Sequence, residues 1–255
     1  MFMDVIEKIS NAALSKSNLL KKSKGKYLVS SALAGIFVGL GVILIFTIGG
    51  VLSAANSPYT KIIMGISFGV ALSLVVMAGS DLFTGNYMVM TIGSLEKKVS
   101  LGEAVKVWIF CFLGNLIGSV LISILYAYSG LATGPVAEFI VKASAAKIAA
   151  PALELFIRGI LCNILVCLAI WCSFKLKEET SKLIMIFWCL FVFITSGFEH
   201  SVANMSLLAI GLLIPHPASI TISGYGYNLL IVTIGNMVGG IVFVALAYWY
   251  ISKDK

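Results

Sequence analysis

The sequence predicts an all-α membrane protein with six transmembrane helices, arranged as an inverted repeat in which the second and fifth helices are broken. Of its 255 residues, 60% are hydrophobic and 11% are charged, whereas a soluble domain carries roughly a quarter charged residues. The apolar residues occur in long runs that match the roughly 20 residues an α-helix needs to cross a bilayer. Two of these runs are interrupted by polar residues at equivalent places in the two halves of the chain.

Residues 1–26 are predicted to form a separate amphipathic segment on the cytoplasmic face of the membrane. Apolar residues recur there at helical spacing, with six lysines beside or after them, as in helices that lie flat on a membrane surface. The segment has no apolar core and no cleavage site that would mark a signal peptide. The apolar positions are Phe2, Val5, Ile6, Ile9 and Ala13.

Residues 27–252 are predicted to form a six-span domain with inverted halves at about 27–128 and 152–251. Fourteen lysines fall in the terminal segments and in the connections on their side of the membrane, against three on the other side. Because lysine is enriched in cytoplasmic loops, both termini are predicted to be cytoplasmic. The net charge of +7 is thus assigned to topology and not to nucleic-acid binding. The apolar runs are 27–52, 60–94, 104–128, 152–174, 182–213 and 226–251.

The two interrupted runs contain the motifs AGSDLFTGN at 78–86 and TSGFEHSVAN at 195–204. Each motif predicts a half-helix, a loop and a second half-helix. A further similarity links the third and sixth spans, where GNLIG at 114–118 recurs as GNMVG at 235–239, 121 residues later. Three spans per half give opposite orientations and therefore an inverted repeat. The alternative is coincidence, because GxxxG is common where membrane helices pack closely.

Irregular backbone cannot face lipid, so both breaks are expected to line a cavity or to be buried in protein. The second half-helices are predicted to begin near Thr84 and near His200, with free N–H groups and positive dipole ends directed inward. Two such ends favour an anion over a cation. His200 is predicted to line a pore, whereas His216, which lies between two prolines, is assigned to the surface.

Other charged residues at membrane depth are candidates for function, since buried charge is rare in membranes. Asp81 and Glu199 either hold the breaks in shape by accepting hydrogen bonds or act on a ligand. Glu154 and Arg158 are spaced i,i+4 and form either a mutually neutralising pair or a subunit contact. Lys147, just before the fourth span, is either an ordinary rim charge or a cation that draws anions inward.

Three motifs, occurring in this order, resemble the formate/nitrite transporter family over essentially the whole chain. They are LFTGN at 82–86, GILCN at 159–163 leading to VCLAIW at 166–171, and GFEHSVANM at 197–205. The resemblance implies an aquaporin-like subunit in a bacterial plasma membrane, assembled as a homopentamer with one anion pore per protomer. Asp81 and Gly85 differ from the glutamate and serine of formate-channel members, which leaves the substrate open.

The resemblance also implies individual roles. Thr84 corresponds to the central-loop threonine, His200 to the central histidine and Lys147 to the vestibule lysine. The apolar pore residues are an outer constriction of Phe68 and Phe193 and an inner one of Leu72, Leu82 and Val166, with Phe83 nearby. The residues predicted to order the loops are Asp81, Asn86, Asn163, Glu199 and Asn204.

A bare anion faces a steep desolvation cost at apolar constrictions, so it is expected to cross as its neutral acid. The proton comes from bulk water or from His200 after Lys147 and the helix ends have concentrated the anion. Within the family, the whole chain most resembles the hydrosulfide ion channel branch, so hydrosulfide is the preferred permeant. Its acid is also abundant near neutral pH, which makes the protonation step easy. Formate and nitrite are the alternatives.

Other functions fit the sequence less well. An intramembrane hydrolase using Ser80 and His200 lacks the GxSG pattern, and a water or glycerol channel lacks the Asn-Pro-Ala turns. Two histidines cannot supply the ligands of a haem or metal enzyme. The sequence therefore predicts no enzyme, no catalytic residue, no metal and no cofactor.

Overall fold

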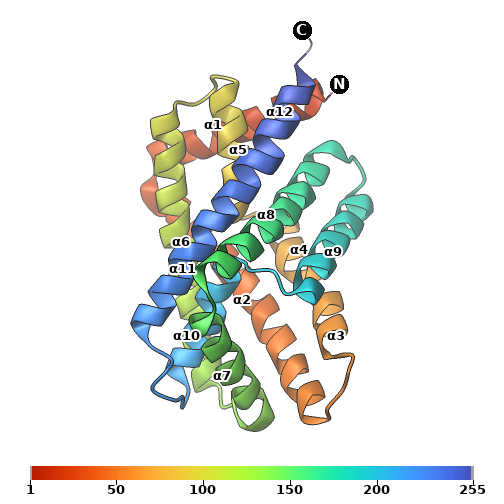
Figure 1. Cartoon of the computed structure of the whole chain (residues 1–255). Helices are drawn as coiled ribbons and strands as arrows, with labels where there is room; N and C mark the ends of the chain where they lie inside the picture. Colours follow the sequence, from red (N-terminus) through yellow and green to blue (C-terminus); the bar gives the residue numbers. More distant parts are fainter. Residues whose placement is uncertain (1, 254–255) are drawn as a thin grey trace.

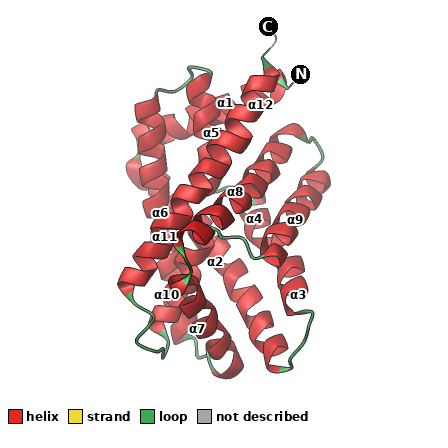
Figure 2. Cartoon of the chain, viewed as in Figure 1, coloured by secondary structure: helices red, strands yellow, loops and turns green. Residues whose placement is uncertain are grey.

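The computed structural model describes residues 2–253, which are helical throughout apart from short connections (Figures 1 and 2). The two ends of the chain lie at the same end of the molecule (Figure 1). The helices are α1 (Met3–Lys22), α2 (Lys24–Ala54), α3 (Thr60–Ser67), α4 (Gly69–Met77), α5 (Phe83–Leu95), α6 (Leu101–Tyr128), α7 (Gly134–Ala149), α8 (Ala152–Lys175), α9 (Glu179–Ser196), α10 (Ser201–Leu213), α11 (Ile222–Val238), the π-helix η1 (Gly239–Leu246) and α12 (Ala247–Ser252).

The predicted six crossings and two broken helices are confirmed. Six stretches of the described residues are long and apolar enough to span a membrane. The second crossing consists of α3, α4 and, after a break, α5, and the fifth consists of α9 and, after a break, α10. The α9–α10 connection passes through the middle of the bundle, where Figure 2 shows it as a loop between helices. The helical hydrogen-bond pattern of the second crossing is also interrupted at Phe68, between α3 and α4, which the sequence did not predict.

Each half of the molecule is held together by one close helix pair, α2 with α6 and α8 with α11. The predicted GxxxG motifs form these contacts. A Cβ atom on Gly118 would collide with the backbone of Ala32, and one on Gly235 would collide with the backbone of Phe156. The glycines therefore let the paired backbones approach closely, which is how helices associate where lipid removes the hydrophobic driving force.

Helix α7 lies in the connection between the halves, for which the sequence analysis predicted no element. Pro135 stands in its first turn, where the missing N–H is not needed. The helix packs on α2, with Phe139 against Phe46 at a centroid distance of 5.6 Å. It brings Lys147, near its C-terminus, to the second break.

Helix α1 packs with its apolar face against the helix bundle. Val5, Ile6, Ile9 and Ala13 are each at most 1% exposed, and α1 contacts α5 most extensively. The ring of Phe2 lies edge-on to Trp171 and Tyr248 at 6.0 and 5.8 Å between centroids. The apolar face predicted for a membrane surface is therefore buried against the bundle, and α1 covers the first break much as α7 covers the second.

Candidate functional site

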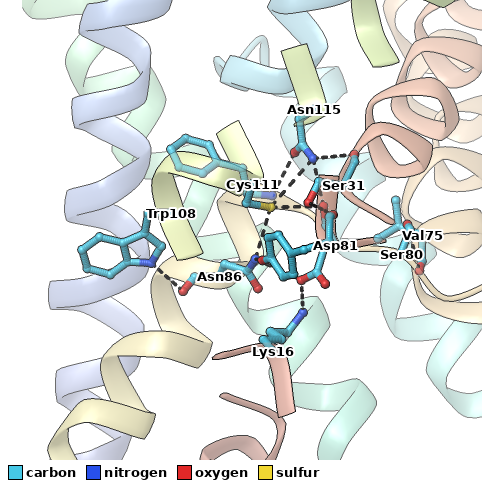
Figure 3. A network of polar contacts seen from close by, with 11 residues as sticks. Lys16, Ser31, Val75, Ser80, Asp81, Asn86, Trp108, Cys111 and Asn115 are labelled. Carbon is cyan, nitrogen blue, oxygen red and sulfur yellow. Dashed lines mark hydrogen bonds and ion pairs between the residues drawn. The ribbon is translucent and has the colours of Figure 1, made fainter. Parts of the chain in front are cut away.

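The first break runs from Ala78 to Leu82 and is held by one asparagine side chain (Figure 3). Asn115 Oδ1 accepts a hydrogen bond from Phe83 N, the first N–H of α5, at 2.9 Å. Its Nδ2 donates to Asp81 O and to Ser31 O, both at 2.8 Å. Gly79 turns the chain at φ +79°, a conformation that only glycine adopts readily. Backbone groups released by the break therefore find partners in protein, as a membrane interior demands.

The second break, from Gly197 to His200, repeats this arrangement. Asn236 Oδ1 accepts from Ser201 N at 2.9 Å, and Asn236 Nδ2 donates to Glu199 O and Gly159 O at 2.9 and 2.8 Å. Gly197 has φ +78°. The sequence analysis used Asn115 and Asn236 only as markers of a repeat and missed their hydrogen bonding. The asparagine that recurs at the second position of each GxxxG motif was the sequence signal that could have revealed this hydrogen bonding.

The acidic residue of each break is paired with a lysine and an asparagine. Asp81 forms an ion pair with Lys16 of α1 and accepts from Asn86 Nδ2 at 3.1 Å (Figure 3). The second break repeats these contacts: Lys147 Nζ lies 2.6 Å from Glu199 Oε2, and Asn204 Nδ2 lies 2.7 Å from the same oxygen. Both carboxylates are nearly buried, at 6% and 4% exposure.

The sequence analysis predicted that Asp81 and Glu199 order the loops, and the contacts of their carboxylates fit that role. Lys16 was not predicted as a site residue, because it lies 65 residues from Asp81 in the chain. Glu154 and Arg158 form the i,i+4 pair foreseen, but on an exposed face. Arg158 enters the site through its backbone, where its carbonyl accepts from Glu199 N at 3.2 Å.

Thr84 and His200 meet at the centre of the molecule, with Thr84 Oγ1 2.9 Å from His200 Nε2. They are not equivalent in the repeat. Asp81 and Glu199 are 118 residues apart, as are Asn86 and Asn204, so the counterpart of His200 is Leu82. Leu82 is the N-cap of α5, which begins at Phe83, one residue before the predicted start.

The two ring nitrogens of His200 are both occupied. Nδ1 accepts a hydrogen bond from Ala203 N at 3.1 Å, which makes the imidazole the N-cap of α10. An accepting Nδ1 carries no proton in the neutral ring, so the proton resides on Nε2 and points to Thr84 Oγ1. A ring in this tautomer donates from Nε2 and cannot act there as a general base.

The backbone carbonyl of Thr84 is held from the fourth span. Asn163 Nδ2 donates to Thr84 O at 3.1 Å and to Asn236 O at 2.7 Å, and Cys167 Sγ lies 3.6 Å from Thr84 O. Asn163 thus ties the first turn of α5 to the sixth span. This places the three predicted asparagines, Asn86, Asn163 and Asn204, in buried hydrogen-bond networks.

Two vestibules approach this centre from opposite sides. The α1-side vestibule, of about 550 Å³, is lined by Lys16, Ser80, Leu82, Gly85 and Lys182 among others. The α7-side vestibule, of about 210 Å³, is lined by residues that include Lys61, Phe139, Lys147, Ala203 and Asn204. Phe68, Phe193 and His200 line the inner end of the α7-side vestibule.

Between the vestibules lies a cavity of about 10 Å³, about the space one water needs. Phe68, Phe193 and His200 separate it from the α7-side vestibule, and Leu82 separates it from the α1-side vestibule. The rings of Phe68 and Phe193 meet edge-on at 5.5 Å. Leu72 and Val166 also line the cavity, together with Val38, Ala71 and Leu190. The residues predicted for the two apolar constrictions thus all line this cavity, with Phe68 and Phe193 toward one vestibule and Leu82 toward the other.

Two predicted pore residues lie off this passage. Phe83 packs against Tyr87 and Phe112, with centroids 4.7 and 5.1 Å away, because the first helical position of α5 points toward α6. Thr84 is fully buried and lines none of the three cavities. It reaches the passage only through His200.

Comparison with known proteins gives a consistent picture. Residues 3–250 match the family described as "Formate/nitrite transporter". The nitrite transporter NirC of Salmonella typhimurium is 46% identical over 256 residues, covering 100% of this chain and 94% of its own. Two solved structures superpose on the fold. One, an "FNT family ion channel", has a TM-score of 0.94 at 42% identity, covering 99% of this chain and all of its own. The other, a "Pentameric formate channel with formate bound", has a TM-score of 0.80 at 30% identity, covering 91% and 98%.

Proposed function

Because the chain belongs to the formate/nitrite transporter family, we propose that it forms a pore for nitrite, with formate as a second permeant, in a bacterial plasma membrane. The relatives named for nitrite and formate support these anions over hydrosulfide, the permeant that the sequence analysis preferred. The pentameric neighbour supports a homopentamer in which every protomer has its own passage. The lysine distribution supports a cytoplasmic location for both termini and for the α1-side vestibule.

The observation that carries the proposal is the position of His200 in an apolar cavity between two vestibules that contain lysines. The vestibules suit an anion, whereas the cavity walls offer mainly phenyl rings and aliphatic side chains. A charged permeant would lose its hydration there without replacement, at a cost of many kcal/mol. The permeant therefore takes up a proton in a vestibule and passes the cavity as nitrous or formic acid.

The hydrogen bonds of His200 bear on which group donates that proton. The sequence analysis allowed either water or His200 as the donor. Protonating His200 at Nδ1 breaks the cap on Ala203 N, so the geometry favours water of the vestibule. His200 acts instead as a neutral donor, whose Nε2–H turns from Thr84 Oγ1 to the permeant oxygen. Thr84 holds the ring between passages.

The same tautomer argues against a hydrolase. The Ser80 hydroxyl lies on the α1-side vestibule and its nearest polar contact is Val75 O at 3.5 Å. Thr84 is the hydroxyl next to His200, but Nε2 already carries the ring proton and cannot accept another from Thr84. A nucleophile and its base are therefore not assembled.

Flux through the purified protein in liposomes tests the proposal. Nitrite, formate, hydrosulfide and chloride are supplied in turn between pH 5 and 8. We expect nitrite and formate flux to rise as the pH falls, because more neutral acid forms, and chloride flux to stay at the level of empty liposomes. Thr84→Val should change the rate of nitrite flux, whereas Thr84→Ser should preserve it. Chloride passing as fast as nitrite at every pH would contradict passage as a neutral acid.

A further inference from the structure

The α7-side vestibule contains two lysines, and they differ in whether a carboxylate neutralises their charge. Lys147 Nζ lies 2.6 Å from Glu199 Oε2, so this pair carries no net charge. Lys61, in the first turn of α3, lines the same vestibule. Among the described residues, no carboxylate lies within ion-pair distance of Lys61, whose side chain is exposed to solvent.

The α1-side vestibule has no equivalent of Lys61. Its two lysines are Lys16, which is paired with Asp81, and Lys182, whose Nζ lies 2.8 Å from Glu179 Oε1. Within residues 2–253, Lys61 is therefore the one lysine on either vestibule that is left without an ion pair. The two entrances differ in charge although the frame of the two breaks is repeated.

We propose that Lys61 is an anion-capturing residue at the mouth of the α7-side vestibule, in addition to the ion-paired Lys147. This rests on the proposed function, and the ligand is the same small monovalent oxyanion in its ionised form. An unpaired ammonium attracts an anion over roughly 10 Å at moderate salt, whereas a neutral ion pair has no long-range field. Lys61 raises the local anion concentration outside the phenylalanine rings, where the proton is taken up.

Capture of this kind changes the concentration at which the pore saturates and leaves the maximal rate unchanged. The effect also depends on ionic strength, because salt screens an exposed charge. Lys61→Gln removes the charge with little change of volume, and Lys61→Arg retains it. Lys142→Gln is the matched control, since Lys142 lies on α7, is exposed and lines neither vestibule.

The test is nitrite uptake into cells or oriented liposomes with nitrite on the α7 side. At about 10 mM ionic strength, we expect Lys61→Gln to raise the half-saturating nitrite concentration by about 3–10-fold, and at about 0.5 M salt by less than about 1.5-fold. Lys61→Arg and Lys142→Gln should match the unmodified protein in both conditions. Equal half-saturating concentrations for Lys61→Gln and the unmodified protein at low salt overturn the proposal. Absence of nitrite and formate flux in the unmodified protein would overturn the proposed function itself, so the two failures are distinguishable.

Discussion

The two breaks share one frame and differ at the residue that caps the second half-helix. In both, an asparagine from the following span binds the first helical N–H, and an acidic residue binds a lysine and an asparagine. The cap is Leu82 in the first break and His200 in the second. Leu82 has no side-chain acceptor to offer α5, whereas the His200 imidazole caps α10. The frame that holds a helix break is thus duplicated, while the polar group on the passage occurs once.

The sequence analysis expected the N-termini of α5 and α10 both to attract an anion, and the different caps make the two ends unequal. At α10, the Ser201 and Ala203 N–H groups are already bound by Asn236 and His200. At the start of α5, the Phe83 N–H is the one with a side-chain acceptor among residues 2–253, and that acceptor is Asn115. The positive end of α5 is therefore the less occupied of the two, and Gly85 in its first turn lines the α1-side vestibule. The two sides of the passage favour anions by different means: an open helix end on one and Lys61 on the other.

The largest effect is expected from the asparagines that the frames share. Asn115→Ala and Asn236→Ala each leave one N–H and two C=O groups without their side-chain partner. The carbonyls of Ser31 and Gly159 lie inside α2 and α8 and keep their helical hydrogen bonds, so two groups lose their partner in each variant. At about 1–3 kcal/mol for each of these two groups, we expect a loss of roughly 2–6 kcal/mol. Thermal unfolding of the detergent-solubilised protein measures this, with the exposed Asn11→Ala as the control. A large loss in one variant and none in the other would break the equivalence of the frames.

Much of this frame was predictable from sequence, because hydropathy fixes the crossings and polar residues mark their interruptions. The motifs at 78–86 and 195–204 located both breaks to within a few residues. Helix α7 was missed since it is only 16 residues long and mixes Glu138, Lys142 and Lys147 with apolar residues. Its burial depends on α2, which a local pattern does not contain. The pairing of Lys16 with Asp81 was missed for the same reason, as it depends on where α1 docks.

A smaller effect is expected from the lysines of the two ion pairs. Lys16→Met and Lys147→Met each leave a nearly buried carboxylate with only its asparagine donor. Because both lysine side chains are about one-fifth exposed, we expect a loss of about 2 kcal/mol, below that for a fully buried pair. Adding Asp81→Asn or Glu199→Gln should restore part of it. Thermal unfolding of the four variants measures the recovery, and no recovery in either pair would show that the carboxylates are not the source of the loss.

The sixth span offers a way to perturb Thr84 without touching it. A Cβ atom on Gly240 of η1 would lie 2.7 Å from Asn163 Nδ2 and 3.0 Å from Cys167 Sγ, the two groups beside Thr84 O. Gly240→Ala is expected to cost about 1–3 kcal/mol by overpacking and to shift the pH profile of nitrite flux. Gly226→Ala is the control, because its Cβ meets nothing within 4 Å. In an Asn163→Ala background the shift should be much smaller, whereas an additive shift would mean that Gly240 acts through another contact.

The smallest effect on stability, and the most direct test of the difference between the breaks, is at the cap of α10. His200→Asn retains an acceptor for Ala203 N and removes the ring proton directed at Thr84, whereas His200→Leu copies the cap of α5 and removes both. An uncapped helix start costs about 1 kcal/mol. We therefore expect His200→Leu to be less stable than His200→Asn by about that amount, while both change nitrite flux and its pH profile. Equal stability with unequal flux would mean that the ring matters for the passage alone, and that α10 needs the cap no more than α5 does.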